Sequence, residues 1–327
     1  MAKPKVFVTR VLPERGQRII EDYCEADVWT EAMPPARETI LQRVPGIEGL
    51  ACLLTDVIDA PVMDAAGPQL KVISNCAVGF DNIDVQAASA RGIAVGNTPD
   101  VLTEATADFT FGLMIAAARR IPEGQRYVRA GKWKTWEPSL LLGVDLKGAT
   151  LGLVGFGRIG KAMARRASGS EMRVIFYDPM DDENDPEIHA QKVDLGTLLD
   201  ESDFISLHAP LTEATRHLIN AAALGRMKPN SVLVNTSRGP VVDMQALYLA
   251  LRDHRIFAAA LDVTEPEPLP SDSPLLGLDN LIVSPHIGSA SRSTREKMSW
   301  MTAQNLIAGL KGERLPNCVN PEVYGSK

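Results

Sequence analysis

Three residues in the second half of the chain have the side chains needed for proton transfer at a carbonyl beside a carboxylate. They are Arg238, Glu267 and His286. A guanidinium can grip the carboxylate and polarise the neighbouring keto oxygen. An imidazole can give a proton to that oxygen, or take one in the reverse direction. A carboxylate can hydrogen-bond the second ring nitrogen, which favours the imidazolium and fixes the ring. Alone, each residue would usually be a surface or loop residue, so the prediction depends on what accompanies them.

A glycine-rich turn accompanies them, between an apolar run at 151–154 and a helix-like segment. The first glycine permits a tight turn, the second lets a pyrophosphate approach the backbone, and the third lets helix and strand pack closely. Free N–H groups at the start of the helix then face the phosphates. The alternative is a glycine turn that binds nothing. The residues expected to contact a dinucleotide here are Gly155, Gly157, Arg158, Ile159 and Gly160.

Asp178 indicates which dinucleotide is bound. It ends a second apolar run at 173–177, at the spacing from the glycine turn that dinucleotide sites show. A carboxylate there accepts hydrogen bonds from a ribose 2′-hydroxyl and repels a 2′-phosphate. Acidic residues follow at 181–183, and no Arg or Lys occurs before Lys192. The sequence therefore favours NAD(H) over NADP(H), with a solvated acidic loop as the alternative.

The elements that must position these residues alternate between strand-like and helix-like segments, which implies parallel sheets covered by helices. The expected strands are 5–9, 26–29, 50–54, 70–75, 93–96, 151–154, 173–177, 204–207, 231–235, 258–262 and 281–284. The expected helices are 14–23, 37–43, 61–66, 85–90, 102–130, 161–166, 221–227, 244–252 and 291–312. Arg238, Glu267 and His286 each follow a strand, at the edge where ligands bind in such sheets.

The two longest helices suggest how the chain divides into domains. The helix at 102–130 is too long for a simple crossover, and the helix at 291–312 can return to the first domain. We expect an α/β protein with two doubly wound, Rossmann-like parallel sheets, one inserted into the other. Residues 1–100 and 288–327 would form a discontinuous, flavodoxin-like substrate-binding domain, and residues 101–287 the NAD-binding domain.

Composition limits the possible partners. The 327 residues carry a net charge of −7 without a basic run, which argues against nucleic-acid binding. No signal peptide, membrane span or metal-ligand cluster is expected. The four cysteines are widely spaced and suggest buried thiols in a reducing compartment, so a cytoplasmic location is expected.

Taken together, the motifs resemble the D-isomer-specific 2-hydroxyacid dehydrogenases over nearly the whole chain. The matching segments are 78–84, 155–160 with Asp178, 208–212, 235–239, 262–268 and 285–288. The resemblance implies an Arg–Glu–His triad in which Glu267, not Glu265, pairs with His286. It implies that the backbone N–H groups of Val78 and Gly79 bind the substrate carboxylate. The further residues it places along the cofactor are Leu102, Thr106, His208, Pro210, Thr236 and Asp262.

Within that family, the segments at 133–138, 142–148 and 315–322 look like those of the glyoxylate/hydroxypyruvate reductases. In those relatives the Trp-containing loop reaches into the neighbouring subunit's site. In this chain the loop holds two large aromatics in a polar stretch with no evident core of its own, and such residues are more often buried at an interface. We therefore expect a homodimer with Trp136 near the partner's substrate pocket, with local packing of the loop against the long helix as the alternative. Those reductases often carry Arg or Lys after the second strand and prefer NADPH, whereas this chain has Asp178.

The sequence therefore predicts NAD-dependent reduction of a small 2-keto acid, glyoxylate or hydroxypyruvate, to the D-2-hydroxy acid. A phosphorylated acid is disfavoured because the segments expected to line the site offer no second cation beyond Arg238, although Lys132 or Lys134 could supply one. A short-form phosphoglycerate dehydrogenase, a phosphite dehydrogenase and a non-catalytic NAD-sensing corepressor remain as alternatives. Glu267 argues against a formate dehydrogenase, which has Gln at this place.

Overall fold

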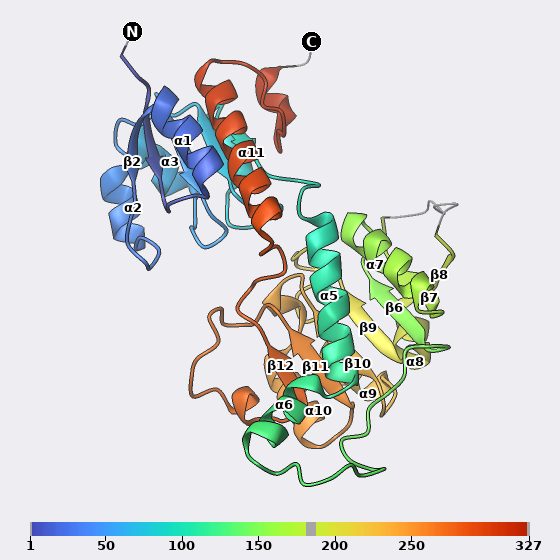
Figure 1. Cartoon of the computed structure of the whole chain (residues 1–327). Coiled ribbons are helices and arrows are strands. Elements are labelled where there is room, and N and C mark those ends of the chain that lie inside the picture. Colours follow the sequence, from blue (N-terminus) through green and yellow to red (C-terminus); the bar gives the residue numbers. More distant parts are fainter. Residues whose placement is uncertain (1, 181–187, 326–327) are drawn as a thin grey trace. The chain divides into compact units, whose positions relative to one another are not determined.

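The structure is a computed structural model that describes residues 2–180 and 188–325. The chain divides into two compact units. Unit 1 consists of Met1–Leu102 and Ala290–Lys327, and unit 2 consists of Thr103–Ser289. Both boundaries lie two residues beyond those expected from the sequence. Each unit is a parallel sheet with helices packed on it, as Figure 1 shows.

The sheet of unit 1 has five strands in the order β2-β1-β3-β4-β5, which is the flavodoxin-like order. Neighbouring strands pair in parallel. The central strands β3 and β4 are buried along their length because helices cover both faces. They lack the alternation of a half-exposed strand, and β4 ends in two buried polar residues, Ser74 and Asn75. The strands are β1 (Lys5–Val8), β2 (Glu25–Val28), β3 (Gly49–Cys52), β4 (Val72–Asn75) and β5 (Ala94–Gly96).

The C-terminal helix completes unit 1. α11 (Arg292–Leu310) packs on β3 and β4 and against α1. The close approach requires small residues, because a Cβ at Gly16 of α1 would lie 2.1 Å from the Ser299 carbonyl oxygen. The other helices are α1 (Glu14–Tyr23), α2 (Arg37–Arg43), α3 (Ala60–Ala66), α4 (Val85–Ala90) and the short η3 (Pro321–Tyr324).

The sheet of unit 2 has seven strands in the order β12-β11-β10-β9-β6-β7-β8. The chain starts in the middle with β6, moves outward to β8, and returns to β9 on the other side of β6. This reversal creates the switch point at which dinucleotides bind in such sheets. The strands are β6 (Thr150–Val154), β7 (Arg173–Tyr177), β8 (Ala190–Lys192), β9 (Phe204–Leu207), β10 (Val232–Asn235), β11 (Ala258–Leu261) and β12 (Leu281–Val283).

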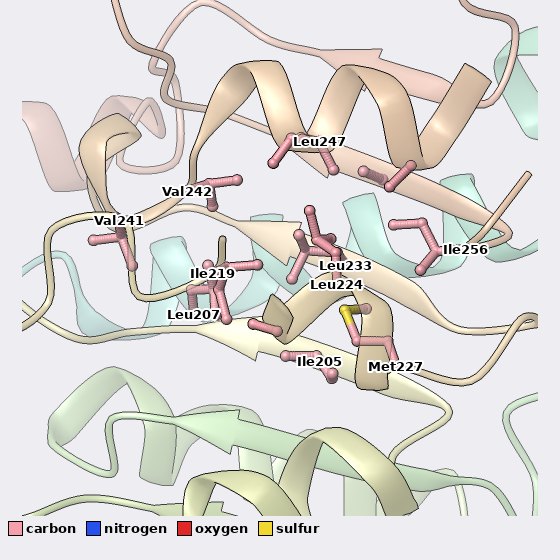
Figure 2. Close-up of a cluster of buried hydrophobic side chains, with 14 of the residues drawn as sticks. Ile205, Leu207, Ile219, Leu224, Met227, Leu233, Val241, Val242, Leu247 and Ile256 are labelled. Atoms are coloured by element: carbon pink, nitrogen blue, oxygen red, sulfur yellow. The ribbon is translucent and has the colours of Figure 1, made fainter. Parts of the chain in front are cut away.

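Helices on both faces bury apolar side chains against this sheet. On one face, residues of β9 and β10 meet residues of α9 and α10, as Figure 2 shows for Ile205, Leu233, Leu224 and Leu247. On the other face, α5 and α7 pack on the sheet and on each other. The helices are α5 (Thr103–Ala118), α6 (Ile121–Arg129), α7 (Arg158–Gly169), α8 (Leu195–Glu201), α9 (Ala221–Arg226), α10 (Met244–Arg252), η1 (Gly239–Val241) and η2 (Pro274–Gly277).

The single helix expected over 102–130 is wrong, because the structure has two helices there. α5 ends at Ala118, Arg120 adopts a left-handed backbone with φ of 52°, and α6 begins at Ile121. Pro122 lies in the first turn of α6, where its missing N–H costs nothing, whereas inside a continuous helix it would remove a hydrogen bond. β8 and α8 were not expected from the sequence.

In the part of the chain that the structure describes, no helix is both long and apolar enough to cross a bilayer.

Candidate active site

The three residues singled out for proton transfer all lie in unit 2, in loops at one edge of its sheet. Arg238 follows β10, Glu267 lies in the loop after β11, and His286 lies in the loop after β12. These strands are neighbours and run in parallel, so their carboxyl ends share an edge. The fold thus brings together loops from three separate parts of the sequence.

His286 and Glu267 are in direct contact. The Nδ1 atom of His286 lies 2.6 Å from the Oε1 atom of Glu267. Both side chains remain partly open to solvent, with exposed fractions of 25% and 36%. Nε2 of His286 makes no hydrogen bond to any residue between 2–180 or 188–325. One ring nitrogen is therefore oriented by a carboxylate while the other is available to a reacting group.

Asp262 fixes the loop that carries His286. Its buried carboxylate accepts hydrogen bonds from Ser284 Oγ at 2.6 Å, from the N–H of Ile287 at 2.9 Å and from the N–H of Gly288 at 2.7 Å. Its backbone carbonyl accepts the N–H of His286 at 2.9 Å. These bonds hold His286 in a left-handed backbone with φ of 54°. The family resemblance implied that Asp262 lies along the cofactor, and the sequence did not reveal that its carboxylate holds the His286 loop.

Glu265 ties the loop before Glu267 to another segment. Its two carboxylate oxygens accept hydrogen bonds from His217 Nε2 and from Arg216 Nη1, both at 2.8 Å. The hydrogen bond from His217, and then that from Arg216, lowers the pKa of Glu265. Glu265 is thus committed to a structural contact, which leaves Glu267 as the partner of His286. The contact could not be predicted from the sequence, because Arg216 and His217 lie some fifty residues before Glu265.

Arg238 stands at the end of a short turn that Asn235 closes. The buried Asn235 amide donates to the Arg238 carbonyl at 2.8 Å, and its side-chain oxygen accepts from Ser237. Arg238 Nη1 donates to the Ser237 carbonyl at 2.9 Å. A Cβ at Gly239 would lie 1.9 Å from the Thr264 carbonyl oxygen, so only glycine lets this turn meet the Glu265 loop.

The glycine turn fits a dinucleotide, and each glycine has a distinct reason to be glycine. Gly155 has φ of +92°, and a Cβ there would lie 2.7 Å from the backbone of His208 and Ala209. A Cβ at Gly160 would lie 2.4 Å from the Gly155 carbonyl oxygen. A Cβ at Gly157 would meet nothing within 4 Å. Folding explains the first and third glycines. The described residues leave open space at Gly157, which is what the close approach of a phosphate needs.

Asp178 follows β7 and contacts the glycine turn. Its Oδ2 accepts the N–H of Phe156 at 2.7 Å and its Oδ1 accepts the N–H of Met180 at 2.8 Å. Each carboxylate oxygen can accept a further bond, so a ribose hydroxyl fits the same side chain. Arg158 and Ile159 are the first residues of α7. The acidic residues at 181–183 lie outside the described part of the chain.

The other residues expected along the cofactor lie mostly in unit 2. His208 and Pro210 follow β9, beside the switch point. His208 Nε2 lies 2.9 Å from Ser206 Oγ, and burial lowers the pKa of His208 to about 4. The Thr110 hydroxyl of α5 donates to the Thr106 carbonyl at 2.6 Å and lies 2.8 Å from the Thr236 hydroxyl. Leu102, by contrast, is the last residue of the first segment of unit 1.

The remaining substrate-binding candidates are found in two loops. Val78 and Gly79 lie in unit 1, in the loop after β4, and both are partly buried. Trp136 lies in unit 2, in the loop after α6, with 79% of its surface exposed.

Comparisons with known proteins agree with this arrangement. The sequence model of the NAD-binding domain of the D-isomer specific 2-hydroxyacid dehydrogenases matches residues 111–288. A glyoxylate reductase of Korarchaeum cryptofilum is 54% identical over 98% of this chain and 97% of its own length. A crystal structure of a Thermus thermophilus protein superposes with a TM-score of 0.90 at 48% identity, covering 96% of this chain and 99% of that one.

A more distant structure has a cofactor bound. It is an NADPH-dependent glyoxylate/hydroxypyruvate reductase of Sinorhizobium meliloti in complex with NADP and malonate, and it is 32% identical with a TM-score of 0.86 and 98% coverage of both chains. The match to the family model, the similarity to full-length relatives and the glycine turn all indicate the same family. The chain belongs to the D-isomer specific 2-hydroxyacid dehydrogenases, a family of oxidoreductases, and uses a nicotinamide dinucleotide as its cofactor.

Proposed function

We propose that this chain reduces a small 2-keto acid, glyoxylate or hydroxypyruvate, to the D-2-hydroxy acid with NADH. The observation that carries the proposal is the 2.6 Å contact between Glu267 and His286, beside the loop of Arg238 in a nicotinamide-binding unit. The glyoxylate reductases at up to 54% identity over nearly the full chain support the choice of substrate. Unit 1 would bind the substrate and unit 2 the cofactor.

His286 is the proposed acid and base. Nicotinamide, when bound, supplies the hydride. His286 Nε2 gives a proton to the keto oxygen as the carbonyl is reduced, and takes it back in the reverse direction. Glu267 stabilises the protonated ring through Nδ1 and keeps Nε2 turned toward the substrate. After proton transfer the neutral ring needs a new proton from solvent, which the partial exposure of both side chains allows.

Arg238 and the amides of Val78 and Gly79 are the proposed carboxylate ligands. A guanidinium donates two parallel hydrogen bonds to a carboxylate and can also polarise the adjacent keto oxygen. Backbone N–H groups are well suited to the same anion because they carry no mobile side chain and are held by the fold.

NADH is the proposed reductant, in preference to NADPH. The support is Asp178, which repels a 2′-phosphate and whose oxygens, each already bonded to one backbone N–H, can accept a further bond from a ribose hydroxyl. The Sinorhizobium meliloti relative is NADPH-dependent, so cofactor choice is a property of each sequence. Competing titrations with NADH and NADPH on one preparation test it. Tighter binding of NADPH would contradict the proposal.

The decisive experiment measures NADH oxidation with a panel of 2-keto acids, including a phosphorylated one. We expect turnover of glyoxylate and hydroxypyruvate. His286→Ala should lower turnover by about 10²–10⁴, the usual contribution of an acid–base group. Arg238→Lys should not restore what Arg238→Ala loses, because a point charge cannot form the bidentate contact. Absence of turnover with every acid would favour a dinucleotide sensor, and near-normal activity of His286→Ala would remove the mechanism.

A further inference from the structure

The loop after β4 has three successive carbonyl groups held by hydrogen bonds. The Ala77 carbonyl accepts the N–H of Thr98 at 2.9 Å. The Val78 carbonyl accepts Asn97 Nδ2 at 2.8 Å, and the Gly79 carbonyl accepts Asn75 Nδ2 at 2.9 Å. The peptide that carries the Val78 N–H is therefore held by the Thr98 backbone, and the peptide that carries the Gly79 N–H is held by the Asn97 side chain. Asn75 holds the next peptide, which follows Gly79.

The hydrogen bonds to these carbonyls also fix the directions of the neighbouring N–H groups. In a trans peptide the C=O and the following N–H point in opposite directions. The Ala77 and Val78 carbonyls both face residues 97–98, so the N–H groups of Val78 and Gly79 share the opposite side. In the described chain neither N–H donates a hydrogen bond. Successive N–H groups on one side form a concave anion site.

The two asparagines are themselves held. Asn75 is fully buried at the end of β4, and its Nδ2 also lies 3.1 Å from the side-chain oxygen of Asn82. The backbone carbonyl of Asn97 accepts Nδ2 of Asn305, a fully buried residue of α11, at 2.9 Å. Oδ1 of Asn305 accepts the N–H of Asn317 at 3.0 Å. The C-terminal segment of unit 1 thus supports the loop.

We propose that Asn97 is a positioning residue for substrate binding, which orients the Gly79 amide toward the carboxylate, while Asn75 supports the same loop one peptide further on. The inference rests on the proposed function, since it concerns the same substrate. Neither asparagine touches the reacting atoms in this scheme. Asn97 acts through the Val78 carbonyl that it holds, because a peptide whose carbonyl is released can rotate, and the Gly79 N–H of that peptide would then lose its alignment with the anion.

The test uses Asn97→Ala and the equal-sized Asn97→Asp, which cannot donate to the Val78 carbonyl. The matched control is Asn280→Ala, which removes an amide that donates to the Leu251 and Phe257 carbonyls in unit 2. Three quantities are measured: the inhibition constant of oxamate, an unreactive analogue of a 2-keto acid; KM and kcat for glyoxylate; and the Kd of NADH by fluorescence.

We expect both Asn97 variants to raise the inhibition constant of oxamate and KM about 10- to 100-fold, the range for a lost hydrogen bond to a charged group. The fall in kcat should be much smaller, because the lost contact binds the substrate equally well in its ground state and its transition state. The Kd of NADH should change less than about twofold, because NADH binds to unit 2. Asn97→Asp should fold even if Asn97→Ala does not. An unchanged oxamate constant in Asn97→Asp, or an equal rise in Asn280→Ala, overturns the inference. A wild-type chain that binds no oxamate and reduces no 2-keto acid instead rejects the proposed function itself.

Discussion

At the scale of single residues, the glycine turn separates what folding requires from what a ligand requires. Gly160 is confined by the protein itself, since a Cβ there would lie 2.4 Å from a carbonyl oxygen of the turn. Gly157 is not, because a Cβ there would point into open space and its backbone is extended, with φ of −70°. The two glycines of one motif therefore have different physical causes, and substitution can tell them apart.

Alanine substitutions should show this difference. Gly157→Ala should cost at most about 1 kcal/mol, the usual penalty for alanine at a helix N-cap, but should weaken NADH binding at least about tenfold. Gly160→Ala should destabilise the fold by about 1–3 kcal/mol through overpacking. Thermal unfolding and NADH fluorescence titration measure the two effects. Gly169→Ala, where a Cβ also meets nothing, is the control. Unaltered NADH affinity in Gly157→Ala would contradict the role given to this glycine.

His208 makes stability depend on pH. Burial lowers its pKa to about 4, whereas a histidine of the unfolded chain has a pKa of about 6.5. Between these values the unfolded state binds the proton and the folded state does not, so stability is lost as the pH falls through this window. The melting temperature should therefore fall more between pH 7 and 4.5 in the wild type than in His208→Asn. The exposed His254→Asn is the control. If the melting temperature falls equally with pH in all three proteins, His208 does not contribute to the pH dependence.

At the scale of elements, the end of β12 is held by a single buried carboxylate. Asp262 follows β11 and receives three hydrogen bonds from the segment that carries His286, in addition to the backbone bond from His286 itself. The position of the proposed acid thus depends on a residue that follows the neighbouring strand, in addition to the bond from the His286 N–H to the Ser284 carbonyl within its own loop.

Asp262→Asn tests that dependence. An amide nitrogen cannot accept from an N–H group, so at least one donor of the loop loses its partner. We expect destabilisation by about 1–3 kcal/mol, the cost of an unsatisfied buried group. Turnover should fall on the order of 10²-fold because His286 shifts. Ser284→Ala removes only one of the donors and should have a smaller effect on both quantities. Equal effects of the two substitutions would show that the loop is not held by the carboxylate as a whole.

The elements that the sequence misplaced have local causes. The apolar pattern over 102–130 predicted one helix because apolar residues recur beyond the junction, at Ile121, Tyr127 and Val128. The left-handed backbone at Arg120 could not be predicted from a glycine, because there is none at this position. The Arg120 side chain instead forms two hydrogen bonds of 2.8 Å to Glu123. β8 has only three residues, too few for an alternating pattern to be recognised. Most other elements match because strands buried on both faces are uniformly apolar.

At the scale of the whole molecule, the segment at 121–142 of unit 2 exposes several large apolar side chains. α6 has no buried residue, and the loop after it leaves large side chains in water. The exposed fractions are 55% for Ile121, 52% for Val128, 61% for Trp133, 79% for Trp136 and 62% for Leu142. Such clusters usually mark an interface, and aromatic residues are enriched there. We therefore predict a homodimer that buries this surface, with Trp136 close to the partner's substrate.

Sedimentation should give a dimer in the wild type and a weakened one in Trp133→Ala, because a large apolar contact is lost. Trp136→Ala should alter the relative kcat/KM values across the panel of 2-keto acids. Trp300→Ala, which removes a tryptophan that is 36% exposed in unit 1, is the control. A fully active monomer, or a Trp136→Ala enzyme with unchanged kinetics on every acid, would show that the loop has only a local structural role.

The sequence by itself determined the fold class, the glycine turn and the identities of Arg238, Glu267 and His286. These features could be predicted because each depends on a short segment, such as an apolar run, the spacing of glycines or a charged residue that follows a strand. Only the tertiary structure decided how the residues are held. Glu265 meets Arg216 and His217 at a separation of 49 and 48 residues, and Asn97 meets Asn305 at a separation of 208. The reason is that a hydrogen bond depends on distance and direction in space, and residues far apart in the chain acquire these only when the strands and helices pack together.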